Sequence, residues 1–332
     1  MRVLVTGGAG YVGCHAAREL ANAGHEPITF DDLRTGHRSH VRWGPFVAGD
    51  VRNVEHVADT IVRHRCGAVM HFAASAYVGE SVSAPAQYFD NNVGGLASVL
   101  QAMERTRIDR IVFSSTCATY GIPEQVPIDE AHPQRPINPY GDSKFVCERL
   151  LAWHHEAHRT RYATLRYFNA AGAASDHTIG EVHDPETHLI PLAIQAALRT
   201  APPLHVFGGD YATRDGTAVR DFVHVEDLAR AHVAALNVLE SMPIIVTNLG
   251  TGVGTSVAEV IAAVARCTGM DVPTRNAPRR SGDPAELVAD PSAAASLLGW
   301  RARNDLDMIV ASAVAWERQR PQAPSGHHEA VA

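Results

Sequence analysis

The sequence has few cysteines, no surplus of basic residues and no long apolar segment. The formal net charge is −7, so the chain lacks the excess positive charge with which nucleic-acid-binding proteins neutralise phosphates. No window approaches the ~20 apolar residues that cross a bilayer, and the N-terminus lacks the pattern of a signal peptide. The cysteines show no CxxC pair, which fits reduced thiols in a cytosol better than a disulfide framework. We therefore expect a cytoplasmic protein with neither a nucleic-acid nor a membrane partner.

What the sequence does contain is an ordinary globular composition, with 45% apolar and 20% charged residues among 332. This length suggests about two domains. Apolar segments of strand length alternate with helical segments and are centred on residues 3–5, 28–30, 46–48, 68–72, 111–113 and 163–167. Continuous apolar strands separated by helices predict an α/β fold with a doubly wound parallel sheet, Rossmann-like, whose ligands bind beyond the carboxyl ends of the strands.

The composition of the chain and the pattern of predicted elements change after residue 168. Residues 172–220 are rich in Gly, Pro, His and Asp, whereas residues 227–239 read as a helix and residues 244–249 as another buried strand. The first domain is therefore expected at 1–168, with a return segment at about 221–249. A smaller second domain is expected from 169–220 and 250–320, followed by a disordered tail at 321–332.

A glycine-rich motif follows the first strand and reads Gly-Gly-Ala-Gly-Tyr-Val-Gly from Gly7 to Gly13. In such motifs one glycine permits a tight turn, another lets the backbone approach a pyrophosphate, and a third lets the helix pack on the strand. The free amides at the start of the helix then bind the phosphates. We expect dinucleotide contacts from Gly7, Gly10, Tyr11, Val12 and Gly13.

Acidic residues end the next two strands. Asp31 lies 18 residues after Gly13, where a carboxylate can accept both ribose hydroxyls of an adenosine and repel a 2′-phosphate. Asp32 adds negative charge, so the sequence favours NAD over NADP. Arg34 points the other way, because an arginine there can accommodate the phosphate; ordinary solvation of this loop is an equal alternative. Asp50 could hydrogen-bond the adenine.

A second motif, Tyr-Gly-Asp-Ser-Lys, places Tyr140 and Lys144 four residues apart, on one face of a helix. A nearby ammonium and an oxidised nicotinamide would both lower the pKa of the phenol, which could then remove a hydroxyl proton. Alone, this pattern would favour an ordinary Tyr–Lys pair on the surface of a helix. The glycine motif favours the catalytic interpretation, as do Ser114 and Thr116 at the end of another strand, with Thr116 bridging substrate and tyrosine.

Several longer stretches carry a resemblance that covers residues 1 to about 316. These are VLVTGGAGYVG near the start, HFAA and VGES between His71 and Ser81, YFDNNVGG from Tyr88, FSSTCATYG from Phe113, NPYGDSK ending at Lys144, LRYFNAAGA from Leu165, GTAVRDFVHVEDLA from Gly216 and APRRSGDPAELVAD from Ala277. In these stretches the chain resembles the extended short-chain dehydrogenase/reductases, in particular their nucleotide-sugar 4-epimerases.

The resemblance implies an NAD-dependent isomerase of carbohydrate metabolism that interconverts UDP-glucose and UDP-galactose through a transient 4-keto sugar. It implies that Tyr140 is the base, that Lys144 is its partner and that Thr116 relays the proton. The implied cofactor contacts, besides the glycine motif, are Asp31, Asp32, Asp50, Val51, Phe72, Ala73, Ala74, Asn91, Ser114, Tyr140, Lys144 and Tyr167. The implied substrate contacts are Thr116, Tyr140, Asn169, His188, Leu189, Phe207, Arg220, Arg280 and Asp283.

Three positions depart from, or leave open, the pattern of these relatives. Ala76 stands where some carry a lysine near the cofactor phosphates, and His188 stands where some carry a substrate-contacting asparagine. Leu287 occupies the position whose bulk helps decide whether an N-acetyl group fits, and leucine leaves that question open.

Alternatives remain on the same scaffold. A 4-epimerase of a UDP-N-acetylhexosamine, UDP-glucuronate or a UDP-pentose would share the catalytic trio. A dehydratase or decarboxylase is disfavoured, because Cys117 and Ala118 follow Thr116 where those relatives carry acidic residues. A non-catalytic NAD-binding protein would have no need for the Tyr–Lys pair.

Two further expectations concern metals and partners. Histidines 154 and 158 share a helical face, but no ligand motif accompanies them, so a solvated helix is favoured and no metal site is predicted. The resemblance implies a homodimer, with the helices at 87–104 and 143–158 as candidate interfaces.

Overall fold

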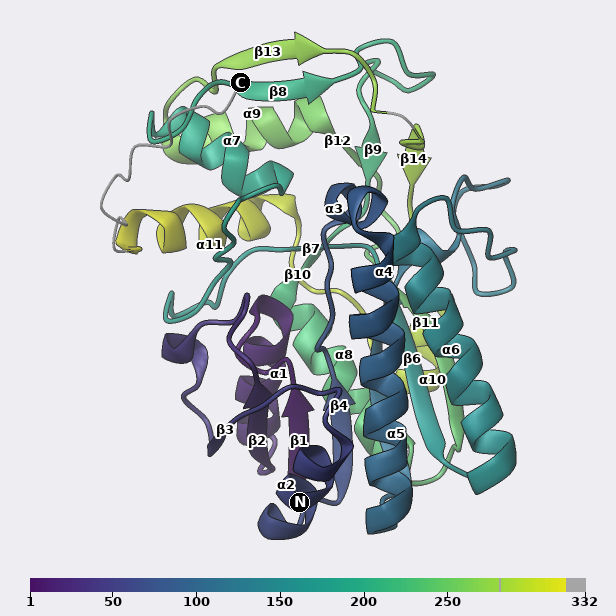
Figure 1. The fold of residues 1–332 in the computed structure, drawn as a ribbon. Coiled ribbons are helices and arrows are strands. Elements are labelled where there is room, and N and C mark those ends of the chain that lie inside the picture. Colours follow the sequence, from purple (N-terminus) through teal and green to yellow (C-terminus); the bar gives the residue numbers. More distant parts are fainter. Residues whose placement is uncertain (281, 321–332) are drawn as a thin grey trace.

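The computed structural model describes residues 1–280 and 282–320; the tail predicted to be disordered, residues 321–332, lies outside the described residues. Seven strands of this described part form one sheet in the order β11-β6-β5-β4-β1-β2-β3, and all neighbours are parallel. The predicted doubly wound, Rossmann-like sheet is confirmed (Figure 1). The strands are β1 (Arg2–Thr6), β2 (Glu26–Asp31), β3 (Phe46–Ala48), β4 (Ala68–His71), β5 (Arg110–Thr116), β6 (Arg161–Tyr167) and β11 (Ile244–Leu249).

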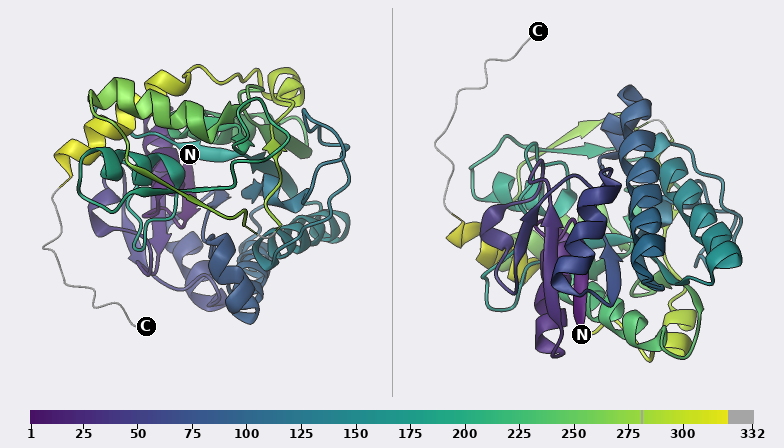
Figure 2. Two further views of the ribbon diagram at one scale, coloured as in Figure 1. Left: turned by 90° about the horizontal axis from the view of Figure 1, so that it is seen from above. Right: turned by 60° about the horizontal axis from the view of Figure 1, so that its bottom comes forward.

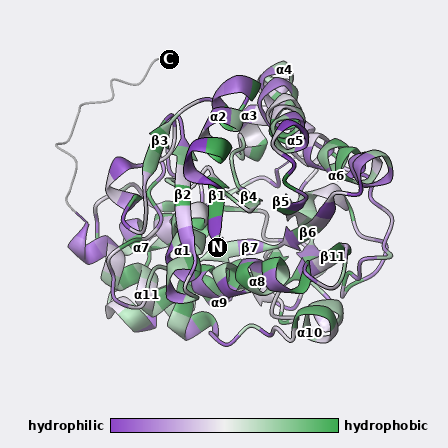
Figure 3. Ribbon diagram, turned by 90° about the horizontal axis from the view of Figure 1, so that it is seen from below, coloured by the Kyte–Doolittle hydropathy of each residue, from purple (hydrophilic) through white to green (hydrophobic). Residues whose placement is uncertain are grey.

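Helices cover both faces of this sheet. Alternate residues of β1 enter different cores: Val3 and Val5 pack with α1 and α8, whereas Leu4 packs with α2 and α5. Since both faces are buried, the strands are continuously apolar rather than alternating. Figure 3 shows apolar residues along the strands and on the helices that flank them. The covering helices are α1 (Tyr11–Asn22), α8 (Val225–Val238) and α10 (Ser292–Leu298) on one face, and α2 (Val54–His64), α5 (Gly95–Thr106) and α6 (Pro139–His158) on the other.

A smaller lobe sits beyond the carboxyl ends of the strands (Figure 1, Figure 2). Its apolar core is formed by α7, α9 and α11, which pack around Ile194, Val260 and Ile309. Short strand pairs complete it. The elements are α7 (Leu189–Ala197), α9 (Val257–Thr268), α11 (Leu306–Gln319), β8 (Leu204–Phe207) with β13 (Thr274–Ala277), and β9 (Val219–Arg220) with β12 (Thr255–Ser256) and β14 (Glu286–Leu287).

The chain passes between the two parts several times. The pair β7 (Asn169–Ala171) and β10 (Phe222–His224) runs between them, and α8 and β11 then rejoin the sheet. The α10 helix also packs against α8 and β11, although it falls in the range 250–320 that was expected to form the second domain. Among the described residues, no helix combines the length and apolar character needed to span a bilayer.

Candidate active site

The glycine motif forms a tight loop between β1 and α1. Gly7 has φ +70°, and a Cβ on Gly13 would lie 2.2 Å from the Gly7 carbonyl oxygen. Only glycine fits either position without strain. Gly10 occupies the N-cap of α1 without any side-chain cap. The first amides of this 12-residue helix therefore remain available to an anion.

The ends of β1 and β4 converge beside this loop. The amides of Phe72 and Ala73 donate to the Thr6 carbonyl at 2.9 and 3.1 Å, and a Cβ on Gly7 would come within 2.5 Å of the Ala73 nitrogen. This is where the strand order reverses, since β1 lies between β2 and β4. Doubly wound sheets bind their ligands at such a point. Ala74 follows directly, whereas Ala76 is exposed.

Asp31 lies buried at the end of β2 and accepts hydrogen bonds from the amides of Ala9 (2.9 Å) and Leu33 (2.8 Å). Burial raises the pKa of its carboxyl, against these two hydrogen bonds. Asp31 therefore holds the glycine loop in place. Asp32, in contrast, is exposed and accepts a hydrogen bond from the Arg34 amide at 3.0 Å. This is the arrangement of an ordinary solvated loop, the alternative given above to a contact with the cofactor.

The carboxylate of Asp50 is held by a neighbouring arginine. Arg52 donates to both of its oxygens, at 3.0 and 2.6 Å, and also pairs with Asp90. The hydrogen bond from Arg52 lowers the pKa of Asp50. The adenine contact of Asp50 stays a prediction, as does that of its buried neighbour Val51.

Helix α5 is preceded by an irregular turn that carries a polar cluster. The predicted continuous helix is broken into α4 (Pro85–Tyr88) and a π-helical turn at 89–94, a feature common at functional sites. Asn91 accepts from Arg34 at 3.1 Å, and Asn92 donates to Ser143 on α6 at 2.9 Å. The turn thus links the loop after β2 to the helix that carries Tyr140.

Tyr140 and Lys144 lie in the first turns of α6, beside the end of β5. Asn138 caps the helix by accepting from the Gly141 amide at 2.8 Å. The Lys144 ammonium donates to the Ser114 carbonyl at 2.8 Å, and Ser114 shares a 2.7 Å hydrogen bond with the Tyr167 hydroxyl. The predicted set from α6, β5 and β6 is therefore brought together.

The acid–base properties of this set are dominated by burial. Burial and the neighbouring Tyr167 raise the pKa of the Tyr140 phenol far above its ordinary value, while a hydrogen bond with Thr116 opposes the rise. Burial lowers the pKa of Lys144 to about 8, against Cys147 and Glu148. In the chain by itself the pKa of the phenol is therefore raised, because desolvation dominates. The lowering expected from the sequence was for a site that also holds an oxidised nicotinamide.

A buried ion pair lies one helical turn beyond Lys144. Glu148 on α6 binds Arg166 on β6, with Nη2 to Oε2 at 2.6 Å, and accepts from Ser115 on β5 at 2.5 Å. The Arg166 guanidinium also donates to Tyr120 at 2.9 Å. These contacts join α6 to two strands. They fix the helix that presents Tyr140.

The predicted substrate residues lie on the smaller lobe or at its junction with the sheet. Arg220 donates to Asp283 at 2.6 Å, and the Arg280 guanidinium stacks 4.0 Å above the Phe207 ring. Two arginines suit a pyrophosphate, because the guanidinium fork binds its oxygens bidentately. Contact with substrate stays a prediction for these residues, and equally for Asn169 at the start of β7 and Leu189 at the start of α7.

His188 is engaged by two carboxylates, and its substrate contact stays a prediction. Its Nδ1 lies 2.8 Å from Glu181 and 2.9 Å from Glu186. Burial alone would lower the pKa of His188, but the hydrogen bonds to these carboxylates raise it to about 10. Together with His183 they form a cluster that sequence reasoning missed. The E-x-H-x-x-E-x-H spacing was the available signal.

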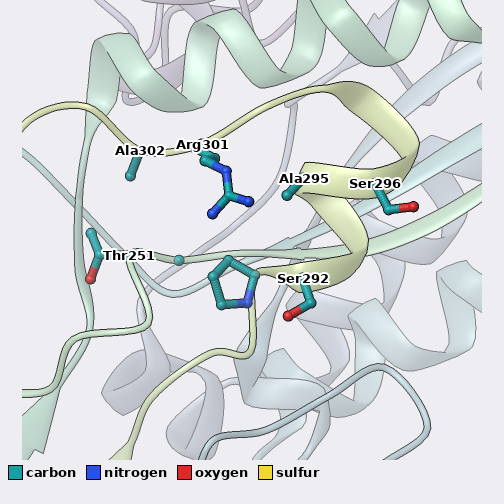
Figure 4. A pocket seen from close by; sticks show the side chains of 8 residues that line it. Thr251, Ser292, Ala295, Ser296, Arg301 and Ala302 are labelled. Carbon is teal, nitrogen blue, oxygen red and sulfur yellow. The ribbon is translucent and has the colours of Figure 1, made fainter.

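Leu287 borders the site, whereas a cavity beside α10 lies outside it. Leu287 of β14 pairs with Arg220 and packs against the core formed by Cys117, Tyr120 and Phe168. A cavity of about 420 Å³ lies farther away, beside α10 (Figure 4). None of the predicted cofactor or substrate residues lines it; its lining is Gly250, Thr251, Pro291, Ser292, Ala295, Ser296, Arg301 and Ala302.

Comparisons with known proteins agree with this geometry. Residues 3–250 match the model of the NAD dependent epimerase/dehydratase family. The chain is 47% identical over 321 residues to UDP-glucose 4-epimerase of Rhizobium leguminosarum bv. trifolii, covering 96% of this chain and 98% of that protein. The solved UDP-glucose 4-epimerase of Brucella ovis in complex with NAD is 51% identical with a TM-score of 0.93, and the match covers 95% of this chain and 97% of that chain. The solved UDP-glucose 4-epimerase of Bifidobacterium longum in complex with NAD+ and UDP is 36% identical with a TM-score of 0.93, and the match covers 97% of this chain and 99% of that chain.

Proposed function

The chain belongs to the NAD dependent epimerase/dehydratase family, and we propose that it is a UDP-glucose 4-epimerase that retains NAD and interconverts UDP-glucose and UDP-galactose. The observation that carries the proposal is the convergence of Tyr140, Lys144 and Thr116 at the carboxyl end of β5, the same edge of the parallel sheet at which the glycine loop follows β1. The names of its relatives agree with it.

The cofactor site fits a dinucleotide. Gly7 and Gly13 permit a turn so tight that a Cβ at either position would collide with backbone atoms, and the uncapped start of α1 after this turn has free amides that suit the cofactor phosphates. Asp31 at the end of β2 suits the adenosine ribose, and Lys144 suits the nicotinamide ribose. When bound, NAD would supply a hydride acceptor and a positive charge near the phenol in its oxidised form, and a hydride donor in its reduced form.

Tyr140 removes the proton of the sugar 4-hydroxyl and later returns it to the 4-oxygen. Thr116 hydrogen-bonds this phenol and relays the proton between substrate and Tyr140. The Lys144 ammonium, fixed by the Ser114 carbonyl, favours the phenolate electrostatically. Arg220 and Arg280 hold the diphosphate while the sugar turns to present its other face.

The wider assignments are also proposals. Residues 1–168 with 221–249 would hold the cofactor, and residues 169–220 with 250–320 the substrate. Five free thiols, four of them buried, suit the reducing cytoplasm. A homodimer through α5 and α6, which lie side by side (Figure 1), would cover Trp153, a side chain that is 68% exposed. Sedimentation as a monomer at micromolar concentration would reject that dimer.

The proposal is tested by proton NMR of the purified chain with UDP-galactose and no added cofactor. We expect UDP-glucose to appear without net reduction of any compound. Tyr140→Phe should slow turnover by about 10²–10⁴-fold while bound NAD stays constant. Tyr162→Phe, at the opposite end of β6, is the matched control and should turn over normally.

Three outcomes would change the assignment. Near-normal turnover by Tyr140→Phe would reject Tyr140 as the base. Epimerisation of UDP-N-acetylgalactosamine, UDP-glucuronate or a UDP-pentose, but not of UDP-galactose, would keep the mechanism and replace the substrate. Absence of any reaction, even with NAD supplied, would reject an epimerase.

A further inference from the structure

Four potential metal ligands cluster in the segment between β7 and α7. Glu181, His183, Glu186 and His188 each point one ligand atom into a common space, and these atoms all lie within 4.8 Å of one another. The cluster contains none of the predicted catalytic residues on α6 and β5, but it includes His188, one of the predicted substrate contacts. It is also compact in sequence, since its members all lie between residues 181 and 188.

The spacing of the ligand atoms matches a small tetrahedral site. The His188 Nδ1 lies 2.8 and 2.9 Å from the oxygens of Glu181 and Glu186, and the His183 Nδ1 lies 3.1 and 3.8 Å from the same two residues. A tetrahedral zinc ion with bonds of ~2.0–2.1 Å separates its ligand atoms by roughly 3.3 Å. The observed distances scatter around that value.

Two buried atoms of the cluster have no hydrogen-bond partner. The Nδ1 of His183 and the Oε2 of Glu186 are buried and unpartnered. The His183 Nδ1 is only 3.1 Å from Glu181, so it is near an oxygen but makes no hydrogen bond to it. The side chains of Glu181 and Glu186 are only 6% and 8% exposed. Unpartnered atoms of this kind are costly unless another group satisfies them.

The charge balance of the four side chains also favours a bound cation. In the described residues, the ion pairs of Glu181 and Glu186 are made with these two histidines alone. The buried carboxylate of Glu148 on α6 is paired instead with an arginine, which carries a permanent charge. A divalent cation among two carboxylates and two neutral imidazoles would give a neutral site, buried at Glu181 and Glu186 and open to solvent at His188, whose side chain is 45% exposed.

We propose that Glu181, His183, Glu186 and His188 bind a structural zinc ion. Two imidazole nitrogens favour zinc over calcium or magnesium, which prefer all-oxygen sites. Four protein ligands fill a tetrahedral shell and leave no open position for a reacting water. The role is therefore to fix this segment rather than to take part in chemistry.

The surroundings show what the ion would fix. The Glu181 carbonyl accepts from Trp316 of α11 at 3.0 Å, and the Val182 carbonyl lies 3.2 Å from His37 Nε2. The His183 ring packs edge-on against Tyr11, with ring centres 6.3 Å apart. Zinc would thus join the entry to α7 with the start of α1 and with α11.

The test uses the full chain, stripped of metal and then loaded with zinc or cobalt. We expect one zinc per chain by elemental analysis, visible absorption typical of tetrahedral Co²⁺, and a melting temperature that rises with zinc concentration. Glu186→Gln and His183→Ala should each weaken zinc binding by more than the ~10–100-fold that loss of an outer-shell partner costs.

Matched controls separate this site from other metal-binding groups. His154→Ala alters the exposed cluster of Glu104, His154 and His158, and Cys267→Ser removes the exposed thiol; both should leave stoichiometry and affinity unchanged. No zinc-dependent melting shift in the native chain, or binding that Glu186→Gln and His183→Ala leave intact, would overturn the proposal. These readouts need no substrate, so they fail independently of the epimerase assignment.

Discussion

The ammonium of Lys144 donates a 2.8 Å hydrogen bond to the backbone carbonyl of Ser114, although both residues are buried. The same ammonium lies 4.8 Å from the centre of the Phe113 ring. One carbonyl and one aromatic face replace the water that normally surrounds a lysine. Lys144 is also the only lysine in the chain, so its chemistry can be observed without interference from other lysines.

The pKa of Lys144 should be measurable directly. Protein labelled with ¹³Cε-lysine should give a single ε-carbon resonance, and titration should place its pKa at about 8, because burial disfavours the ammonium. Unfolded protein in urea, where the same carbon is solvated, should titrate near 10.5. A folded pKa at or above that of the unfolded chain would show that burial does not control this group.

The lowered pKa also predicts how stability depends on pH. Between pH 8 and 10.5 the unfolded chain keeps the Lys144 proton and the folded chain loses it, so the free energy of unfolding should rise with pH. The contribution should be on the order of 3 kcal/mol across this window. Urea denaturation at several pH values measures it. Lys144→Met should lack this rise, and identical pH profiles for the two proteins would reject the prediction.

The buried Glu148–Arg166 pair should contribute strongly to stability. Glu148→Ala leaves the Arg166 guanidinium buried without its carboxylate and should lower the free energy of unfolding by about 3–5 kcal/mol. Denaturant titration is the measurement. Glu55→Ala, which removes the exposed partner of Arg105, is the matched control and should cost less than about 1 kcal/mol. Similar losses for the two variants would contradict the assigned role.

Gly13→Ala should disrupt the cofactor loop. Its Cβ would lie 2.2 Å from the Gly7 carbonyl oxygen, so the loop or the start of α1 has to shift. We expect NAD to be absent from the purified variant, as measured by absorbance after denaturation. Gly79→Ala, where a Cβ meets nothing within 4 Å, should retain NAD. Normal NAD content in Gly13→Ala would show that the loop tolerates the shift.

The sequence was sufficient where a residue's position follows from local pattern. Strand ends such as Asp31 and Thr116 could be placed because buried parallel strands read as continuous apolar segments. The start of α1 at Tyr11 has no such signal, because glycine at the N-cap has no side chain.

Other features depend on contacts between distant residues. Arg52 forms ion pairs with both Asp50 and Asp90. The π-helical turn at 89–94 packs against α6. Neither feature can be predicted from the periodicity of apolar residues along the chain. The dominance of burial in setting the pKa of Tyr140 could not be predicted without knowing how deeply the phenol lies.

The position of β11 has a consequence for synthesis on the ribosome. This edge strand pairs only with β6, yet about 75 residues of chain separate them. A nascent chain that has just completed β6 therefore exposes an unpaired, apolar sheet edge until residue 249 emerges. Such edges invite association with other chains. We expect nascent chains whose emerged part ends between residues 168 and 244 to bind chaperones more strongly than chains from which residue 250 has emerged.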